Sequence, residues 1–234
     1  MNKVVSSADA AVADIGSGAT VMLGGFGLCG IPENLIAALV RRGITGLHTI
    51  SNNMGVDGFG MGLMLEAGMI ASHTGSYVGE NHRLETLVLQ NKLDLTLVPQ
   101  GTLAERIRAG GAGIPAFYTP TGLGTLVAEG KETRAFGSRT YVLEQALRAD
   151  VALIKAWRGD RYGNLVYRKT ARNFNPVMAT AADLTIAEVE ELFDPGMLDP
   201  DHIVTPGIYV DRIVLGPAYI KPIESKFLSS GGRP

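Results

Sequence analysis

The sequence has little of several features that mark particular classes of protein. It contains a single cysteine, Cys29, so no disulfide can form within the chain and a reducing compartment is expected. Its formal net charge is only −2, which argues against the basic surface that nucleic-acid phosphates require. The most apolar stretch, residues 61–71, is interrupted by Gly62, Glu66 and Gly68, whereas a membrane span needs about 18 consecutive apolar residues. We therefore expect a protein that binds neither nucleic acid nor a membrane.

Targeting and metal-binding signals are also missing. Residues 1–7 contain no apolar run followed by a small-residue cleavage site, so they do not predict a signal peptide. Together with the lone cysteine, this predicts a cytoplasmic location. The four histidines are scattered without the spacing of metal ligands, and we expect no metal site; they are His48, His73, His82 and His202.

The sequence has ample apolar side chain and an excess of glycine. Hydrophobic residues make up 46% of the chain and charged residues 19%, which predicts a folded globular protein. Glycine accounts for 30 of 234 residues and clusters between apolar runs, which is typical of tight turns and close backbone approaches. No composition shift divides the chain, so we expect one domain over residues 1–228 and a disordered tail at residues 229–234.

Short apolar runs that predict strands alternate with segments of helical periodicity. Strands are expected at residues 20–23, 47–51, 69–73, 93–98, 151–155, 165–167 and 184–189. Helices are expected from Ser7, at residues 32–43, 61–65, 80–92 and 103–109, and near 171–182. This alternation predicts an α/β fold, a mainly parallel sheet with flanking helices. In such sheets ligands bind beyond the carboxyl ends of strands, here residues 24–30, 52–55 and 99–101.

Two finer expectations concern helix starts. Thr102 and Glu105 form a capping-box pattern for the helix at residues 103–109. Pro32 lies where its missing N–H costs nothing at the opening of a helix.

The first of these loops fits a familiar short pattern. Residues 25–30 read Gly-Phe-Gly-Leu-Cys-Gly and match G-x-G-x-x-G between a strand and a helix. A dinucleotide site also needs an acid at the end of the second strand, but that strand ends Ser51-Asn52-Asn53 and the nearest acid is Asp57. Two explanations remain open: the loop and helix N-terminus bind an anion such as a phosphate, or the glycines only let the chain turn.

The same loop belongs to a longer pattern. Residues 24–32 read Gly-Gly-Phe-Gly-Leu-Cys-Gly-Ile-Pro and resemble the coenzyme A loop, G-G-F-x-x-x-G-x-P, of the family I CoA-transferases. Further similarity to the A (α) subunit of these enzymes lies at residues 51–53, 75–81, 99–106, 110–120, 128–132 and 169–174. The resemblance covers about residues 21–214. It implies the Rossmann-like CoA-transferase domain and transfer of CoA from an acyl-CoA to a free carboxylic acid, with no permanently bound cofactor.

The resemblance also implies that the chain is incomplete as an enzyme. The nucleophilic glutamate of the family lies in a Ser-Glu-Asn-Gly motif of the B subunit, and this sequence has no such motif. Its nearest imitation contains Glu80, which we interpret as an acid at a helix start. We therefore expect no catalytic nucleophile in this chain, inactivity on its own, and an A2B2 assembly in which the partner forms the glutamyl-CoA intermediate.

Several residues receive roles from the resemblance. The CoA-contacting residues it implies are Gly24, Gly25, Phe26, Gly27, Leu28, Cys29 and Gly30. Asn52 and Gln100 are implied at the carboxylate end of the substrate, where neutral amides suit a carboxylate or oxyanion; the residues alone equally allow local turn bonding. Cys29 reads as a loop-filling residue, and Lys169 and Arg172 as a polar cluster that faces a partner, a phosphate or solvent.

The acceptor acid remains open. Residues 75–81 resemble the 3-ketoacid group of the family more than the 3-oxoadipate group, which favours succinyl-CoA and acetoacetate. The alternatives are one half of an acetate:acetoacetate or 3-oxoadipate CoA-transferase, and a non-catalytic nucleotide-binding module built on the same loop.

Overall fold

The computed structural model describes residues 2–79 and 81–221; the expected tail at residues 229–234 lies outside them. Its main sheet has the strand order β11-β10-β8-β1-β2-β3-β4, with β9 paired to β8. All neighbours run parallel except β9, which confirms the expected α/β fold. The strands are β1 (Thr20–Leu23), β2 (Leu47–Ile50), β3 (Ile70–Gly75), β4 (Asp94–Leu97), β8 (Ala149–Asp160), β9 (Leu165–Val166), β10 (Ala182–Phe193) and β11 (Arg212–Leu215).

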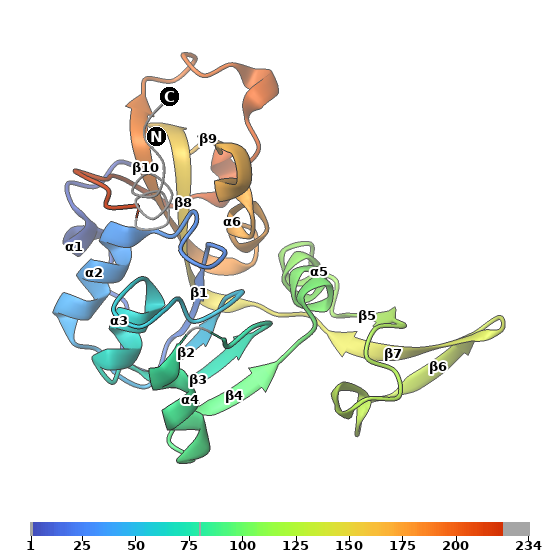
Figure 1. The fold of residues 1–234 in the computed structure, drawn as a ribbon. Helices are drawn as coiled ribbons and strands as arrows, with labels where there is room; N and C mark the ends of the chain where they lie inside the picture. Colours follow the sequence, from blue (N-terminus) through green and yellow to red (C-terminus); the bar gives the residue numbers. More distant parts are fainter. Residues whose placement is uncertain (1, 80, 222–234) are drawn as a thin grey trace, which may run out of the picture.

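Helices cover both faces of this sheet (Figure 1). Side chains along β1 alternate between two buried clusters: Val21 and Leu23 belong to the cluster under the first four helices, and Met22 to the cluster under the other two. This alternation follows from the two-residue period of a strand. The helices are α1 (Ala8–Ala11), α2 (Glu33–Arg42), α3 (Met61–Glu66), α4 (His82–Leu89), α5 (Gln100–Gly111) and α6 (Asn175–Met178). No helix in the described part of the chain has the length and apolar character to cross a membrane.

The ends of α1 and α2 follow local sequence signals. The Ser7 hydroxyl accepts a hydrogen bond from the Ala10 N–H at 3.1 Å and caps α1, as expected. Pro32 immediately precedes α2, and Gly43 ends it in the left-handed conformation that glycine favours.

One helix prediction was wrong and another was too long. Helix α5 begins at Gln100, directly after Pro99, so Thr102 lies inside the first turn and does not cap it; Glu105 instead pairs with Arg108 at 2.7 Å. The helix expected near residues 171–182 is present only as the four-residue α6, after a 3₁₀ turn, η2 (Lys169–Arg172). The positive φ of 22° at Asn173 separates the two, and the chain enters β10 at Ala182.

A small antiparallel sheet projects from the main body (Figure 1). Its strand order is β5-β7-β6, and the sequence analysis predicted none of these strands. The rings of Tyr118, Phe136 and Tyr141 pack edge to face along it. The strands are β5 (Ala116–Thr119), β6 (Thr133–Phe136) and β7 (Arg139–Gln145), and three further 3₁₀ turns lie at η1 (Leu126–Ala128), η3 (Pro200–His202) and η4 (Gly207–Tyr209).

Strand β1 is the topological switch point of the sheet. The chain continues from β1 through β2, β3 and β4 on one side and returns through β8 and β10 on the other. Loops at the carboxyl ends of strands diverge at such a point and leave a crevice for a ligand. The loop after β1, residues 24–30, therefore lies where the fold most readily accommodates one.

Candidate functional site

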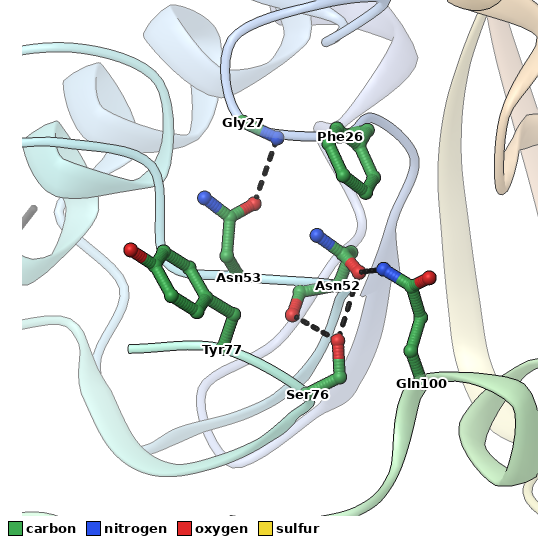
Figure 2. Close-up of a pocket in the computed structure, with 7 residues that line it drawn as sticks. All are labelled: Phe26, Gly27, Asn52, Asn53, Ser76, Tyr77 and Gln100. Atoms are coloured by element: carbon green, nitrogen blue, oxygen red, sulfur yellow. Dashed lines mark hydrogen bonds between the residues drawn. The ribbon is translucent and has the colours of Figure 1, made fainter. Parts of the chain in front are cut away.

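A pocket of about 480 Å³ lies at the carboxyl ends of β1, β2 and β3. The three loops expected to form the site meet there, because residues from each of them line it. Figure 2 shows the lining side chains gathered around one space; they are Phe26, Gly27, Asn52, Asn53, Ser76, Tyr77 and Gln100.

Asn52 is the centre of a hydrogen-bond network in this pocket. Its side-chain oxygen accepts hydrogen bonds from the Ser76 hydroxyl and the Gln100 amide nitrogen, each at 2.8 Å. The Ser76 hydroxyl also lies 3.1 Å from the Asn52 backbone oxygen. Because Asn52 is only 3% exposed, these contacts fix its amide, and Figure 2 shows the nitrogen turned toward the side on which Phe26 lies. The structure thus brings the two predicted residues, Asn52 and Gln100, into direct contact.

The pocket presents neutral donors without a charged side chain. The Asn53 side-chain oxygen accepts a hydrogen bond from the Gly27 N–H at 3.0 Å, which ties the loop after β1 to the loop after β2. Among the described residues, neither the Asn52 nor the Asn53 amide nitrogen has a hydrogen-bond acceptor of its own. The seven described residues that line the pocket include no Asp, Glu, Lys, Arg or His. Such a site suits a carboxylate or a developing oxyanion.

The N-terminus of helix α5 also favours an anion in this pocket. It starts at Gln100 on the pocket wall and has no side-chain cap. The N–H groups of Gln100, Gly101 and Thr102 have no acceptor within the described part of the chain. A helix N-terminus with unpaired N–H groups attracts negative charge. Gln100 was expected on a loop, and its place as the first residue of a helix is a correction that strengthens the site.

The glycines of residues 24–30, which we call the glycine loop, are required mostly by packing. A Cβ atom on Gly24 would lie 1.9 Å from the Asn175 side-chain oxygen, and one on Gly30 would lie 2.5 Å from the Ala171 backbone oxygen. Gly27 differs, because a Cβ there would meet open space and only its φ of +60° favours glycine. The explanation that these glycines let the chain turn and pack is therefore supported for most of them.

The backbone N–H groups of the glycine loop are largely used within the protein. Phe26 and Cys29 exchange two hydrogen bonds of 3.0 Å, and the Gly27 N–H is held by Asn53. Among the described residues, the N–H groups of Gly25, Leu28 and Gly30 have no acceptor, so only part of the N–H cradle of a phosphate-binding glycine loop remains.

The N-terminus of α2, to which the glycine loop leads, is occupied by the protein itself. Glu188 of β10 accepts hydrogen bonds of 2.9 Å from the Leu35 N–H and from the Asn34 side chain. The Glu188 side chain is buried; burial raises the pKa of its carboxyl, and the hydrogen bonds from Asn34 and Leu35 oppose that rise. Glu188 therefore takes the position at which an anion was expected, and that expectation is corrected for α2.

Asn175 holds the glycine loop in place and was missed by the sequence analysis. Its side-chain nitrogen donates to the backbone oxygens of Gly30 and Ala171, each at 3.0 Å, and its oxygen accepts from the Lys155 N–H at 2.8 Å. It is fully buried. No local signal indicates this role, because every loop contact comes from a distant part of the chain.

Other predicted loop residues lie outside the pocket lining. Leu28 is buried in the core, and the half-buried Cys29 places its Sγ 3.6 Å from the Thr170 hydroxyl. Ser76, Asn53 and Tyr77 were not named as site residues. Ser76 directly follows β3, so the rule that selected Asn52 would also have selected it.

Candidate ligands for a metal are separated from one another. No group of three or more His, Cys, Asp or Glu side chains that could hold a metal ion occurs among residues 2–79 and 81–221. His73 is buried beside Thr49, with Nδ1 3.0 Å from the threonine hydroxyl, and burial lowers its pKa to about 4. The expectation for Glu80 concerns a residue outside the described ones.

Comparison with known proteins reveals close relatives. The profile of the Coenzyme A transferase family matches residues 5–216. The chain is 57% identical over 226 residues to the A subunit of the probable succinyl-CoA:3-ketoacid coenzyme A transferase of Bacillus subtilis (strain 168), covering 97% of this chain and 95% of that protein. It is 54% identical to the A subunit of the succinyl-CoA:3-ketoacid coenzyme A transferase of Helicobacter pylori (strain J99), covering 96% and 97%.

A solved structure has the same fold. The acyl-CoA transferase YdiF of Escherichia coli O157:H7, in a thioester complex with CoA, aligns with a TM-score of 0.86 at 24% identity. The alignment covers 94% of this chain and 50% of YdiF, so the chain spans about half the length of that enzyme.

Proposed function

Since the chain belongs to the Coenzyme A transferase family, we propose that it is the A half of a succinyl-CoA:3-ketoacid CoA-transferase. In this proposal it moves CoA from succinyl-CoA to a 3-oxoacid such as acetoacetate, within ketone-body metabolism. The names of its relatives in Bacillus subtilis and Helicobacter pylori support this substrate pair. CoA enters only as part of the substrates.

The observation that carries the proposal is the neutral pocket with unpaired donors. Asn52 and the start of α5 at Gln100 offer N–H groups to a carboxylate or an oxyanion. Among residues 2–79 and 81–221, no carboxylate side chain lines this pocket, which supports a nucleophile supplied by another polypeptide. A neutral site suits this arrangement, because an incoming glutamate anion and the substrate acid then share donors without meeting a fixed negative charge.

The chemistry proceeds by covalent steps on the partner. A partner glutamate attacks the thioester carbonyl carbon of succinyl-CoA, which breaks the C–S bond and forms a mixed anhydride and a CoA thiolate. The thiolate attacks the glutamyl carbonyl, releases succinate and leaves a glutamyl-CoA thioester. The 3-oxoacid carboxylate then attacks the glutamyl-CoA carbonyl, releases the CoA thiolate and forms a second mixed anhydride. The thiolate attacks the 3-oxoacyl carbonyl of this anhydride, which gives the 3-oxoacyl-CoA and frees the glutamate. In this chain Asn52 and Gln100 hold the acid, and the glycine loop, residues Gly24, Gly25, Phe26, Gly27, Leu28, Cys29 and Gly30, lies against CoA.

The assembly is part of the proposal. We place this chain in an A2B2 complex in the cytoplasm, with the B subunit supplying a Ser-Glu-Asn-Gly motif. The family membership and the lack of this motif in the sequence support a partner.

Reconstitution tests the function. The chain is purified alone and together with a partner that bears the Ser-Glu-Asn-Gly motif, and formation of acetoacetyl-CoA from succinyl-CoA and acetoacetate is followed. We expect turnover only from the mixture, and mass spectrometry after incubation with acetoacetyl-CoA to find the CoA adduct on the partner. Turnover by the chain alone, or an adduct on this chain, contradicts the proposal.

Substrate competition separates the alternatives. Acetate is compared with succinate as the acid of the CoA donor, and 3-oxoadipate with acetoacetate as the 3-oxoacid that accepts CoA. A higher kcat/KM for either one would reassign the chain to an acetate:acetoacetate or a 3-oxoadipate CoA-transferase.

A further inference from the structure

The anion site that the glycine loop suggests is closed at α2. Glu188 already accepts the Leu35 N–H, and Glu33 in the first turn accepts the N–H groups of Ile220 and Lys221 at 2.9 and 3.0 Å. A phosphate placed there would lie against two carboxyl groups. If the chain binds acyl-CoA, as proposed above, these two carboxyl groups disfavour the start of α2 as the place of the CoA phosphates.

A group of unpaired cations lies on the other side of the same loop. We call residues 168–172 the basic turn; it carries Arg168, Lys169 and Arg172, all exposed. Among the described residues none of the three forms an ion pair. The Arg168 guanidinium carbon lies 5.3 Å from the centre of the Trp157 ring, a contact that does not neutralise its charge. All three charges are thus free to meet a ligand.

The basic turn is held firmly against the glycine loop. The Asn173 side chain donates to the Cys29 backbone oxygen at 3.0 Å, and the Asn175 side chain to that of Gly30 at 3.0 Å. Lys169 and Asn173 have positive φ values of 50° and 22°, a backbone conformation that residues other than glycine rarely adopt. Residues kept in such conformations by surrounding contacts cluster at functional sites.

The basic turn also borders a depression beside the start of α5. Arg172 lines this depression of about 490 Å³ together with Gly101 and the ion pair of Glu105 and Arg108, and Gly101 is the chain neighbour of Gln100 on the pocket wall. The pocket lies on the β2–β3 side of the switch point, whereas the basic turn follows β9 on the β8 side. The glycine loop therefore has the neutral donors of the pocket on one side and the turn with three cations on the other.

We propose that the basic turn binds the phosphate groups of the CoA nucleotide while the thioester end occupies the neutral pocket. Arg and Lys side chains form charge-assisted hydrogen bonds with phosphate oxygens, and three of them suit a ligand that carries a diphosphate and a further phosphate. This inference rests on the proposed function and assigns its nucleotide-binding part to residues 168–172.

The test compares a full and a truncated substrate in the assembled complex. The triple variant Arg168→Gln, Lys169→Gln, Arg172→Gln is assayed with succinyl-CoA and with succinyl-pantetheine, which has the same thioester and no phosphate. We expect the KM for succinyl-CoA to rise at least tenfold and kcat and KM for succinyl-pantetheine to stay within twofold. Added salt, which screens exposed charges, should raise the wild-type KM for succinyl-CoA more than that of the variant.

A matched control removes charge elsewhere. Arg83→Gln and Lys92→Gln alter exposed cations in and after α4, and this double variant should keep both KM values. Circular dichroism and gel filtration with the partner establish that each variant folds and assembles.

The outcomes are distinguishable. An unchanged KM for succinyl-CoA in an active complex overturns this inference alone. Equal losses on both substrates would make the turn a support of the loop, and failure to assemble would make it a contact with the partner; both overturn it. A wild-type complex that transfers no CoA refutes the proposed function, and the inference falls with it.

Discussion

The position of the glycine loop depends on one buried amide, Asn175, and we predict a large effect of its removal. In Asn175→Ala the backbone groups of Lys155, Gly30 and Ala171 lose their hydrogen-bond partner. A hydrogen bond contributes about 1 kcal/mol net, and a buried group left unpaired costs more. We therefore expect the free energy of unfolding to fall by roughly 3–5 kcal/mol, a large share of the stability of a typical domain.

A second substitution makes this prediction sharper. In Gly24→Ala the new methyl group would lie 1.9 Å from the Asn175 side-chain oxygen, so the amide must leave its site and most of the same stability is lost. In the Asn175→Ala background the nearest remaining atom is the residue 175 Cα at 3.5 Å, an ordinary contact. There Gly24→Ala should cost less than about 1 kcal/mol, giving a coupling energy of about 2 kcal/mol or more.

The assay is urea unfolding of the four proteins, followed by circular dichroism and by the fluorescence of Trp157, the single tryptophan. Linear extrapolation gives each free energy of unfolding. Gly27→Ala is the control, because a Cβ there meets open space; it should cost about 1 kcal/mol for its positive φ and show no coupling to Asn175→Ala. Additive effects of Gly24→Ala and Asn175→Ala would refute the reasoning.

Other predictions concern pH, the α2 terminus and the pocket. Burial lowers the pKa of His73 from 6.5 to about 4, so stability should decrease by about 3 kcal/mol as the pH falls through this range; urea unfolding at several pH values should show a flatter profile for His73→Gln. Glu188→Ala leaves the Leu35 N–H unpaired and should lower the free energy of unfolding by about 2 kcal/mol, whereas no change would contradict the capping role. Asn52→Ala and Gln100→Ala should each lower kcat/KM of the reconstituted complex about 10²-fold with unfolding midpoints little changed, and wild-type rates would exclude both from the site.

The location of the pocket could be predicted from the sequence because it follows from topology. The carboxyl ends of parallel strands meet at one edge, so Phe26, Asn52 and Gln100, each just after a predicted strand, had to be neighbours. Their hydrogen bonds, including the 2.8 Å contact between Gln100 and Asn52, depend on side-chain directions that no spacing specifies.

The supports of the site could not be predicted. Asn175 lies 145 residues from Gly30, and Glu188 lies 153 residues from Leu35, so neither contact leaves a local pattern. The capping box predicted at Thr102 failed although its spacing is present in the sequence, because the helix begins earlier, directly after Pro99.

The projecting sheet escaped prediction because it buries so little. All four residues of β6, Thr133–Phe136, are exposed, so the strand lacks the apolar alternation that reveals a half-buried strand. Long strands were recognised but shortened: β8 and β10 extend well beyond their apolar centres because each finds a partner along its length.

The uncharged lining of the pocket has a consequence for enzymology. The seven described lining residues include no Asp, Glu, His, Lys or Arg, so in the proposed function the binding of the substrate acid by this pocket does not depend on the protonation state of such a side chain. A bell-shaped dependence of turnover on acidity would then report ionisations of the substrates or of the companion polypeptide. In the proposed complex the partner supplies the carboxylate that titrates, and this chain supplies neutral hydrogen-bond donors whose charge does not change with pH.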